Sequence, residues 1–380
     1  MTAFTNTEQP DLRSTGSPDP QPAGIGRASA DSPDRPRAIS ATTSDYWLTL
    51  LGSAIGSLGL VWLLYERILP FSGTIGFYIC WYVAYLAMFT VVTAIVHKPT
   101  IVVDRLWTAL ITGAAGFVGI ALASTVGYTV VRGWAAVHHL NFFTESESAG
   151  SPLTSPLTVG GILNAIVGTL IELVIATAVS VPLGIGTAIF MVEVGGWFAR
   201  VVRTVVEAMT ALPDILAGLF IYTFLIIALG VQRSGFAAAT ALSVMMLPII
   251  ARTADVQLRA VPGGLREASL ALGATQWRTV WRVVIPTQLS GLATAVILGM
   301  ARAVGETAPV LITSGFSTYL AINPFVNPMN SLPLAIFTAV RSGQNLFIER
   351  GFGTGIVLLA LVLILFATVR LLARSKVARR

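Results

Sequence analysis

An arginine and a glutamate lie inside one apolar stretch of this 380-residue chain. Between Leu289 and Ser314 every residue is uncharged except Arg302 and Glu306. A stretch of this length spans a bilayer with some tilt, and an arginine at the centre of a spanning helix costs about 2.5 to 3.5 kcal/mol. The guanidinium group therefore needs a partner or a wet interior, and its permanent charge and planar donors suit an oxyanion. On one predicted helix, residues four apart share a face.

This spacing has two interpretations. In the first, both side chains line the path of an anion. Glu306 would repel that anion, so its expected roles are to hold Arg302, to limit how tightly the anion binds, or to accept a hydrogen bond from a proton-bearing oxygen. In the second, the two side chains form an internal ion pair that neutralises both charges. We take the first as the working hypothesis.

Two further carboxylates interrupt apolar segments. Glu172 lies within the run from 161 to 192. A charge inside a spanning helix points to function, which would add Glu172 to the same path, but near the outer third of the membrane it also reaches interfacial water. Both interpretations stay open. Asp214 follows Leu212-Pro213 near the start of a predicted helix, where stabilising the helix dipole is the preferred interpretation.

A polar stretch from 252 to 286 precedes the Arg302 segment. Two short helical segments are predicted in it, punctuated by Pro262-Gly263-Gly264 and by Gly273. Gly273 is expected to end the first of them in the left-handed conformation, which glycine adopts without a Cβ penalty. This is more structure than a simple connector needs.

The polar stretch resembles a known family. Glu267-Ala268-Ser269, Gly273 and Val284-Ile285-Pro286 are similar to the EAA loop of ABC importer permeases, the cytoplasmic segment that docks onto the ATPase subunit. The resemblance implies that Glu267, Ala268, Ser269, Gly273 and Pro286 form the ATPase-coupling loop. Apolar residues such as Leu265, Leu272, Trp277 and Trp281 would fill a groove in the ATPase. The alternative is an amphipathic helix that rests on lipid.

The stretch from Ala301 to Pro309, ARAVGETAP, resembles the ARxxGETAP stretch of the phosphate-specific permeases in this family. Val181-Pro182-Leu183-Gly184 also resembles a recurrent family stretch, and Pro182 is expected to kink its helix. Two positions depart from the pattern. Asp214 stands where the family usually has a small residue such as Ser, and Asp255 stands where relatives often have Glu.

The resemblance implies half of a translocation pathway for inorganic phosphate. The implied partners are a second, homologous permease subunit, a dimer of ATPase subunits and an extracytoplasmic phosphate-binding protein. This chain is expected to bind no cofactor itself, because ATP and Mg²⁺ would be used by the ATPase. A permease for another oxyanion or small solute is the alternative, although it has no reason to keep Arg302 and Glu306. The segment from 316 to 350 is either a docking surface for the binding protein or a plain surface loop.

Composition places the chain in the lipid bilayer. Hydrophobic residues make up 54% and charged residues 11%, against about a quarter charged in soluble domains. The net charge of +6 does not indicate nucleic acid, because the basic residues are scattered at the ends of apolar segments. The single cysteine, Cys80, excludes an intrachain disulfide.

The sequence offers no enzyme site. A P-loop needs Gly-Lys-Ser/Thr, and the two lysines, Lys98 and Lys376, follow His97 and Ser375. The adjacent His138 and His139, followed by what we expect to be flexible acidic residues at 145 and 147, lack the preorganised spacing of a zinc site. A passive channel would need neither the polar loop nor an ATPase. The chain is therefore predicted to be a transporter subunit and not an enzyme.

We predict an all-α polytopic membrane protein with about eight spanning helices. It would consist of an ABC importer type I permease core with an extra N-terminal helical pair. The apolar segments fall at 46–68, 74–96, 106–131, 161–192, 205–230, 235–251, 288–314 and 352–373.

Orientation follows from the distribution of basic residues. With the N-terminus in the cytoplasm, 18 of the 24 Lys and Arg residues fall on the cytoplasmic side and five on the other, with Arg302 in the membrane. Both termini of this plasma-membrane protein are then cytoplasmic. The predicted divisions are a disordered cytoplasmic tail (1–44), N-terminal spanning helices with an external loop (45–158), the permease core with its EAA loop at 252–286 (159–374), and a basic cytoplasmic tail (375–380).

Overall fold

The computed structural model describes residues 44–68, 73–150, 153 and 155–377, and this part of the chain contains helices and no strands. The predicted all-α class is confirmed. The predicted disordered tail lies outside the described residues except for Ser44, and so do the last three residues of the predicted basic tail.

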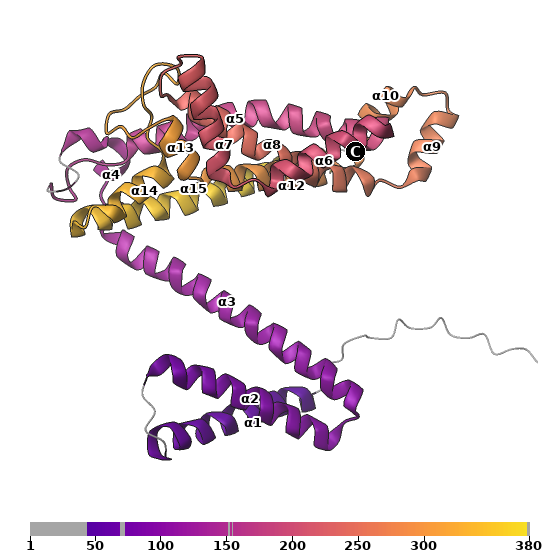
Figure 1. Cartoon of the computed structure of the whole chain (residues 1–380), viewed down its shortest axis with the longest axis vertical. Helices are drawn as coiled ribbons and strands as arrows, with labels where there is room; N and C mark the ends of the chain where they lie inside the picture. Colours follow the sequence, from indigo (N-terminus) through magenta and orange to yellow (C-terminus); the bar gives the residue numbers. More distant parts are fainter. Residues whose placement is uncertain (1–43, 69–72, 151–152, 154, 378–380) are drawn as a thin grey trace, which may run out of the picture. The chain divides into compact units, whose positions relative to one another are not determined.

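The chain divides into two compact units, Met1–Gly116 and Phe117–Arg380, and the boundary falls within the long helix α3 (Pro99–Val137). In the first unit, α1 (Ser44–Trp62), which continues as the π-helical turn η1 (Leu63–Ile68), packs against α2 (Thr74–Val96) (Figure 1). The buried Phe89 ring contacts the Tyr46 and Tyr85 rings at centroid distances of 6.2 and 6.0 Å. Aromatic contacts therefore join the two helices.

The second unit is built around α5 (Leu163–Ile189) and α8 (Gly235–Arg259), with α12 (Leu289–Val304) on α8 and α15 (Asn345–Val377) on α12 (Figure 1). Ile250 of α8 is fully buried between two glycines. A Cβ on Gly184 of α5 would lie 2.8 Å from its Cγ2 atom, and one on Gly299 of α12 would lie 2.7 Å from its Cγ1 atom. The two glycines let the three helices approach closely, as is common in membrane proteins.

Within the described residues, six helices are long and apolar enough to cross a membrane, or up to eight if each of two bent pairs is one span. The apolar segment predicted at 205–230 is one of the bent pairs. α6 (Gly196–Ala211) ends before Leu212-Pro213, and α7 (Asp214–Ile221), continued by the π-helical η4 (Tyr222–Ala228), leaves at 102°. Proline lacks an N–H and disfavours a helical residue before it, and Leu212 is accordingly extended, with φ −72° and ψ 136°.

The predicted continuous helix from Leu289 to Ser314 is also wrong. α12 ends at Val304, and a separate short helix, α13 (Ala308–Thr313), follows after the Gly305–Thr307 break. Pro309 sits in the first turn of α13, where its missing N–H costs nothing. Before α12 the chain forms α10 (Gln276–Thr279), η5 (Val280–Val284) and α11 (Ile285–Thr287), and this run meets α12 at 73°.

α5 runs without a break through Pro182 and, with its continuation η3 (Phe190–Val194), matches the length of the predicted segment at 161–192. α8 and α15 are longer than the segments predicted at 235–251 and 352–373. α8 extends to Arg259, so the first eight residues of the predicted polar loop, from Arg252, are its last two turns.

The second unit has two distinct ends (Figure 1). One end carries α4 (Asn141–Thr144), the 3₁₀ turn η2 (Glu147–Ala149), the segment after α13, and α14 (Leu332–Arg341), whose Leu332 and Leu334 are fully buried. Since α14 packs against α5 and α15, the predicted external segment at 316–350 is not all loop. The other end carries α9 (Gly263–Ala271) and α10, together with the last turns of α15 (Figure 1).

Candidate functional site

Arg302 lies in the last turn of α12, between two carboxylates. Its Nη2 atom donates to Oδ2 of Asp214, the first residue of α7, and lies 3.6 Å from Oε1 of Glu306. Arg302 and Glu306 are close together, as predicted, but they do not lie on one helix. Glu306 follows the end of α12, in a turn where its N–H donates to the Ala303 carbonyl at 3.2 Å.

Asp214 was interpreted mainly as a helix N-terminal residue. It does begin α7, where a carboxylate favours the helix dipole. It also pairs with Arg302, 88 residues away along the chain. The departure from the small residue usual at this position was the only signal of this contact in the sequence.

Asp214 and Arg302 line a cavity of about 370 Å³ whose walls come from α6, α7 and α8. The Arg302 side chain is 50% exposed and that of Asp214 is 31% exposed. Glu306 is more covered, at 18%. The guanidinium group therefore opens into a hollow in the helical bundle, which is where an anion would reach it.

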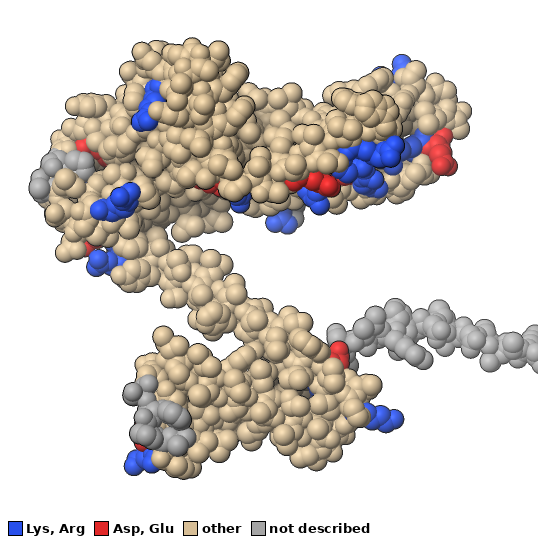
Figure 2. Space-filling view, in the orientation of Figure 1, with Lys and Arg blue, Asp and Glu red and all other residues tan. Residues whose placement is uncertain are grey.

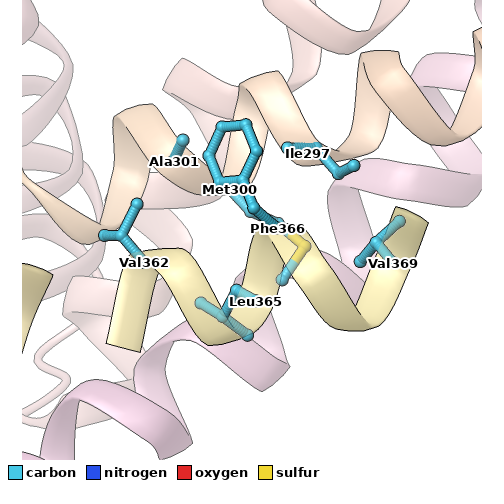
Figure 3. A pocket seen from close by; sticks show the side chains of 7 residues that line it. All are labelled: Ile297, Met300, Ala301, Val362, Leu365, Phe366 and Val369. Atoms are coloured by element: carbon cyan, nitrogen blue, oxygen red, sulfur yellow. The ribbon is translucent and has the colours of Figure 1, made fainter. Parts of the chain in front are cut away.

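A second hollow, between α12 and α15, has no such chemistry. Figure 3 shows that only apolar side chains line it, among them Ile297, Met300 and Phe366. This crevice is a packing feature, since nothing in its lining would bind a charged or polar ligand.

Glu172 is 1% exposed in the middle of α5. It lines a cavity of about 10 Å³ together with Glu306, Thr169 and Ser331, which is about the volume that one water molecule requires. No hydrogen-bond partner of Glu172 Oε1 is present among the described residues. Glu172 is thus away from the surface of the chain, and it is separate from the Arg302 cavity.

The predicted coupling loop is well structured. Gly273 follows α9 with φ +80°, and its N–H donates to the Leu270 carbonyl at 2.9 Å, so the expected left-handed helix end is confirmed. Glu267 and Ala268 are exposed on α9, while Ser269 and Pro286 are half-buried. The Ser269 hydroxyl lies 2.9 Å from that of Thr279, which ties α9 to α10.

One anchor of this loop was missed in the sequence. Arg266 contacts the Glu193 carboxylate at 3.0 Å and donates to the carbonyls of Leu258 and Val261, both at 2.8 Å. Glu193 lies in η3, 73 residues earlier, so no local pattern indicated the contact. Through these bonds the loop is fixed to the ends of α5 and α8.

The loop also presents exposed apolar side chains. Leu272 is 90% exposed, and Trp277 and Trp281 are 60% and 63% exposed. The two tryptophans line an apolar groove of about 640 Å³ beside α5 and α12. Figure 2 shows Lys and Arg side chains gathered near the end that carries α9. An ATPase groove and a lipid surface would both suit this arrangement.

The acidic residues after α4 are not flexible, contrary to our expectation. Glu147 is 3% exposed, and Asn330 Nδ2 lies 3.4 Å from both of its carboxylate oxygens. Burial raises the pKa of Glu147 to about 7, although the Asn164 hydrogen bond and the charge of Arg350 act in the opposite direction. Glu145 accepts a hydrogen bond from the Gly160 N–H at 2.7 Å. These contacts hold the segment after α4 against the segments around Gly160 and Asn330 at one end of the second unit.

Comparison with known proteins identifies the class. The family model described as "Binding-protein-dependent transport system inner membrane component" matches residues 180–378. The helical bundle, its structured loop and this match define a membrane transport component. The chain belongs to the family of binding-protein-dependent transport system inner membrane components, the permease subunits of ABC importers, whose ATPase is a separate subunit.

The names of individual relatives point to a narrower group within this family. The chain is 38% identical over 245 residues to the phosphate transport system permease protein PstA 1 of Mycobacterium tuberculosis, covering 64% of this chain and 78% of that protein. It is 36% identical over 225 residues to PstA of Xylella fastidiosa, covering 58% and 78%. Among solved structures, it is similar to an inward-facing methionine ABC transporter, MetNI, with 21% identity, a TM-score of 0.46, and coverage of 56% of this chain and 93% of that one.

Proposed function

We propose that this chain is the PstA-type permease of an ATP-driven importer for inorganic phosphate, and that Arg302 is the anion-binding residue of its half of the pathway. The observation that carries the proposal is the half-exposed Arg302 side chain, which opens into a cavity of about 370 Å³ within the helical bundle. A guanidinium group offers paired donors to phosphate oxygens. The names of the relatives support phosphate as the anion.

Glu306 and Glu172 take different parts in this proposal. Glu306 contacts the same Nη2 atom of Arg302 as Asp214 does, holds the Arg302 side chain and keeps phosphate from binding too tightly. Glu172 contributes through the small cavity that it shares with Glu306, and it does not touch phosphate in the Arg302 cavity.

The assembly in this proposal contains a second, PstC-like permease subunit, a PstB-like ATPase dimer that uses ATP and Mg²⁺, and a PstS-like extracytoplasmic phosphate-binding protein. The loop at 252–286 couples to the ATPase through Glu267, Ala268, Ser269, Gly273 and Pro286. Residues 159–374 form the permease core. Both termini lie in the cytoplasm, as the basic residues indicate.

Phosphate uptake into vesicles that contain the assembled complex tests the role of Arg302. Arg302→Gln removes the charge and should lower ATP-driven uptake by at least about tenfold, since hydrogen bonds to charged groups are stronger than neutral ones. Arg200→Gln is the matched control, because Arg200 is an exposed residue of α6 outside the cavity lining and outside the coupling loop. Normal uptake by a correctly assembled Arg302→Gln complex would refute the role, and uptake of sulfate in place of phosphate would favour another oxyanion.

A further inference from the structure

The charges around Arg302 do not balance. One guanidinium faces two carboxylates, Asp214 and Glu306, and Asp214 and Glu306 are also close to each other. With all three groups ionised the cluster carries one negative charge. An incoming anion is therefore repelled while both carboxylates are ionised beside the guanidinium group.

The two carboxylates are placed differently. Asp214 lines the 370 Å³ cavity together with Arg302, whereas Glu306 lines the small cavity shared with Glu172. Asp214 is also the more exposed of the two, at 31% against 18%. The Asp214 carboxylate therefore occupies the side of the guanidinium group that faces the open cavity, where an anion would arrive.

The contact joins α7 to α12, whereas α7 packs mainly against α13 and α8. Asp214 is the first residue of α7, and one turn later Gly218 packs against α13, where a Cβ would lie 2.6 Å from the Pro309 Cα atom. The C-terminal half of α7 is fixed by this close approach. Its first turn is tied to α12 by the Arg302 pair, which is separate from the Gly218–Pro309 contact.

We propose that Asp214 is an internal competitor of the transported anion: its carboxylate holds Arg302 when the cavity is empty, and the anion must displace it to bind. This deepens the proposed function and rests on it. An ion pair between partly exposed side chains is weak, so an oxyanion that forms two hydrogen bonds to the guanidinium group can replace it. Asp214 thereby lowers the affinity of the cavity and favours release of the anion after transport.

Equilibrium binding of radiolabelled phosphate tests this. The assembled complex, without nucleotide and without the binding protein, is titrated in lipid nanodiscs. Asp214→Asn keeps the size of the side chain and removes the competing charge, so its Kd should fall about fivefold, which is the equilibrium effect of one exposed ion pair. Asp214→Glu keeps the competitor, and its Kd should stay within about twofold of the wild type.

Glu207→Gln is the matched control, because it removes an exposed carboxylate whose arginine partner lies 3.1 Å away and outside the cavity lining. Its Kd should not change. Should Asp214→Asn assemble poorly, Asp214→Ser provides the same loss of charge. Unchanged or weaker phosphate binding by an assembled neutral variant overturns the inference, since a merely structural residue would lower affinity when replaced.

Failure of the proposed function gives a different result. A wild-type complex that neither binds nor takes up phosphate, but transports sulfate, refutes phosphate as the substrate. The same comparison of Asp214→Asn with wild type is then made with sulfate, because competition depends on the negative charge of the ligand and not on its central atom. Equal affinities in that comparison overturn the role of Asp214 as well.

Discussion

At the scale of single residues, the second unit keeps its charged groups in small, separate clusters. Arg302 has two carboxylates and an open cavity, Arg266 and Glu193 anchor the loop, and Glu147 is enclosed at the opposite end. Each cluster includes a partner from a distant part of the sequence, as Asp214 is for Arg302 and Glu193 is for Arg266. Each cluster therefore joins elements that are far apart in the chain: the Arg302 cluster joins α12 to α7, and the Arg266–Glu193 pair joins α9 to η3.

Glu147 gives the protein a pH-dependent stability. Its pKa is about 7 in the folded chain against a reference value of 4.5, so between these values the folded state holds a proton that the unfolded state has released. The stabilisation is full below pH 4.5 and is lost as the pH rises through 7, an effect of about 3 kcal/mol. Glu147→Gln should therefore raise the unfolding temperature of the purified complex at pH 8 relative to wild type, and leave it nearly unchanged at pH 5.

The control for this measurement is Glu207→Gln, which removes an exposed carboxylate and should not alter the difference between the two pH values. Equal shifts for Glu147→Gln at pH 5 and pH 8 would mean that Glu147 is charged in the folded protein at both.

At the scale of elements, the helices end where particular residues make them end. The break between α6 and α7 was readable in Leu212-Pro213, but the apolar residues on both sides concealed it within one hydrophobic run. The end of α12 at Val304 was concealed in the same way, because periodicity does not distinguish one long buried helix from two short ones. Gly273 was predictable, since a left-handed helix end is a local property of the backbone.

Gly273 tests the coupling loop. Its φ of +80° is strained for a β-branched residue by about 1 to 2 kcal/mol, so Gly273→Val should displace the end of α9 and the exposed Leu272. ATP hydrolysis by the complex should continue, while phosphate uptake per ATP hydrolysed should fall at least about fivefold.

Gly264→Ala is the matched control, because Gly264 lies within α9 and a Cβ there would meet nothing within 4 Å. It should couple normally. Unchanged uptake and normal ATPase association in the Gly273→Val complex would contradict a coupling role for this loop.

At the scale of the whole molecule, composition and apolar segments were sufficient for the class of fold. Long apolar runs are typical of membrane-spanning helices, and α1 with η1 and α2 lie close to the predicted bounds, whereas α3 begins at Pro99 and not at 106. The residues of the candidate site were harder to predict from the sequence than the class of fold. Arg302 and Glu306 could be found because they interrupt an apolar run, but Asp214 is 88 residues from Arg302, and only the folded chain brings them together.

Topology can be tested with two exposed positions at opposite ends of the second unit. In a Cys80→Ser background, Leu272→Cys (90% exposed, after α9) should react with a membrane-impermeant thiol reagent only in inverted vesicles. Tyr319→Cys (72% exposed, after α13) should react in intact cells. Labelling of Leu272→Cys from outside the cell would invert the topology that the basic residues predict.

The continuity of α8 has a mechanical consequence. One end of this 25-residue helix, about 37 Å long, is bound by Arg266 through the Leu258 carbonyl. Ile250, near the middle of α8, packs directly against Gly184 of α5 and Gly299 of α12. Met245 and Pro248 of the same helix line the cavity beside Arg302. Under the proposed coupling, a displacement of α9 is transmitted along α8 to the cavity beside Arg302, and this route passes through Pro248, which lies inside the helix and removes one of its backbone hydrogen bonds.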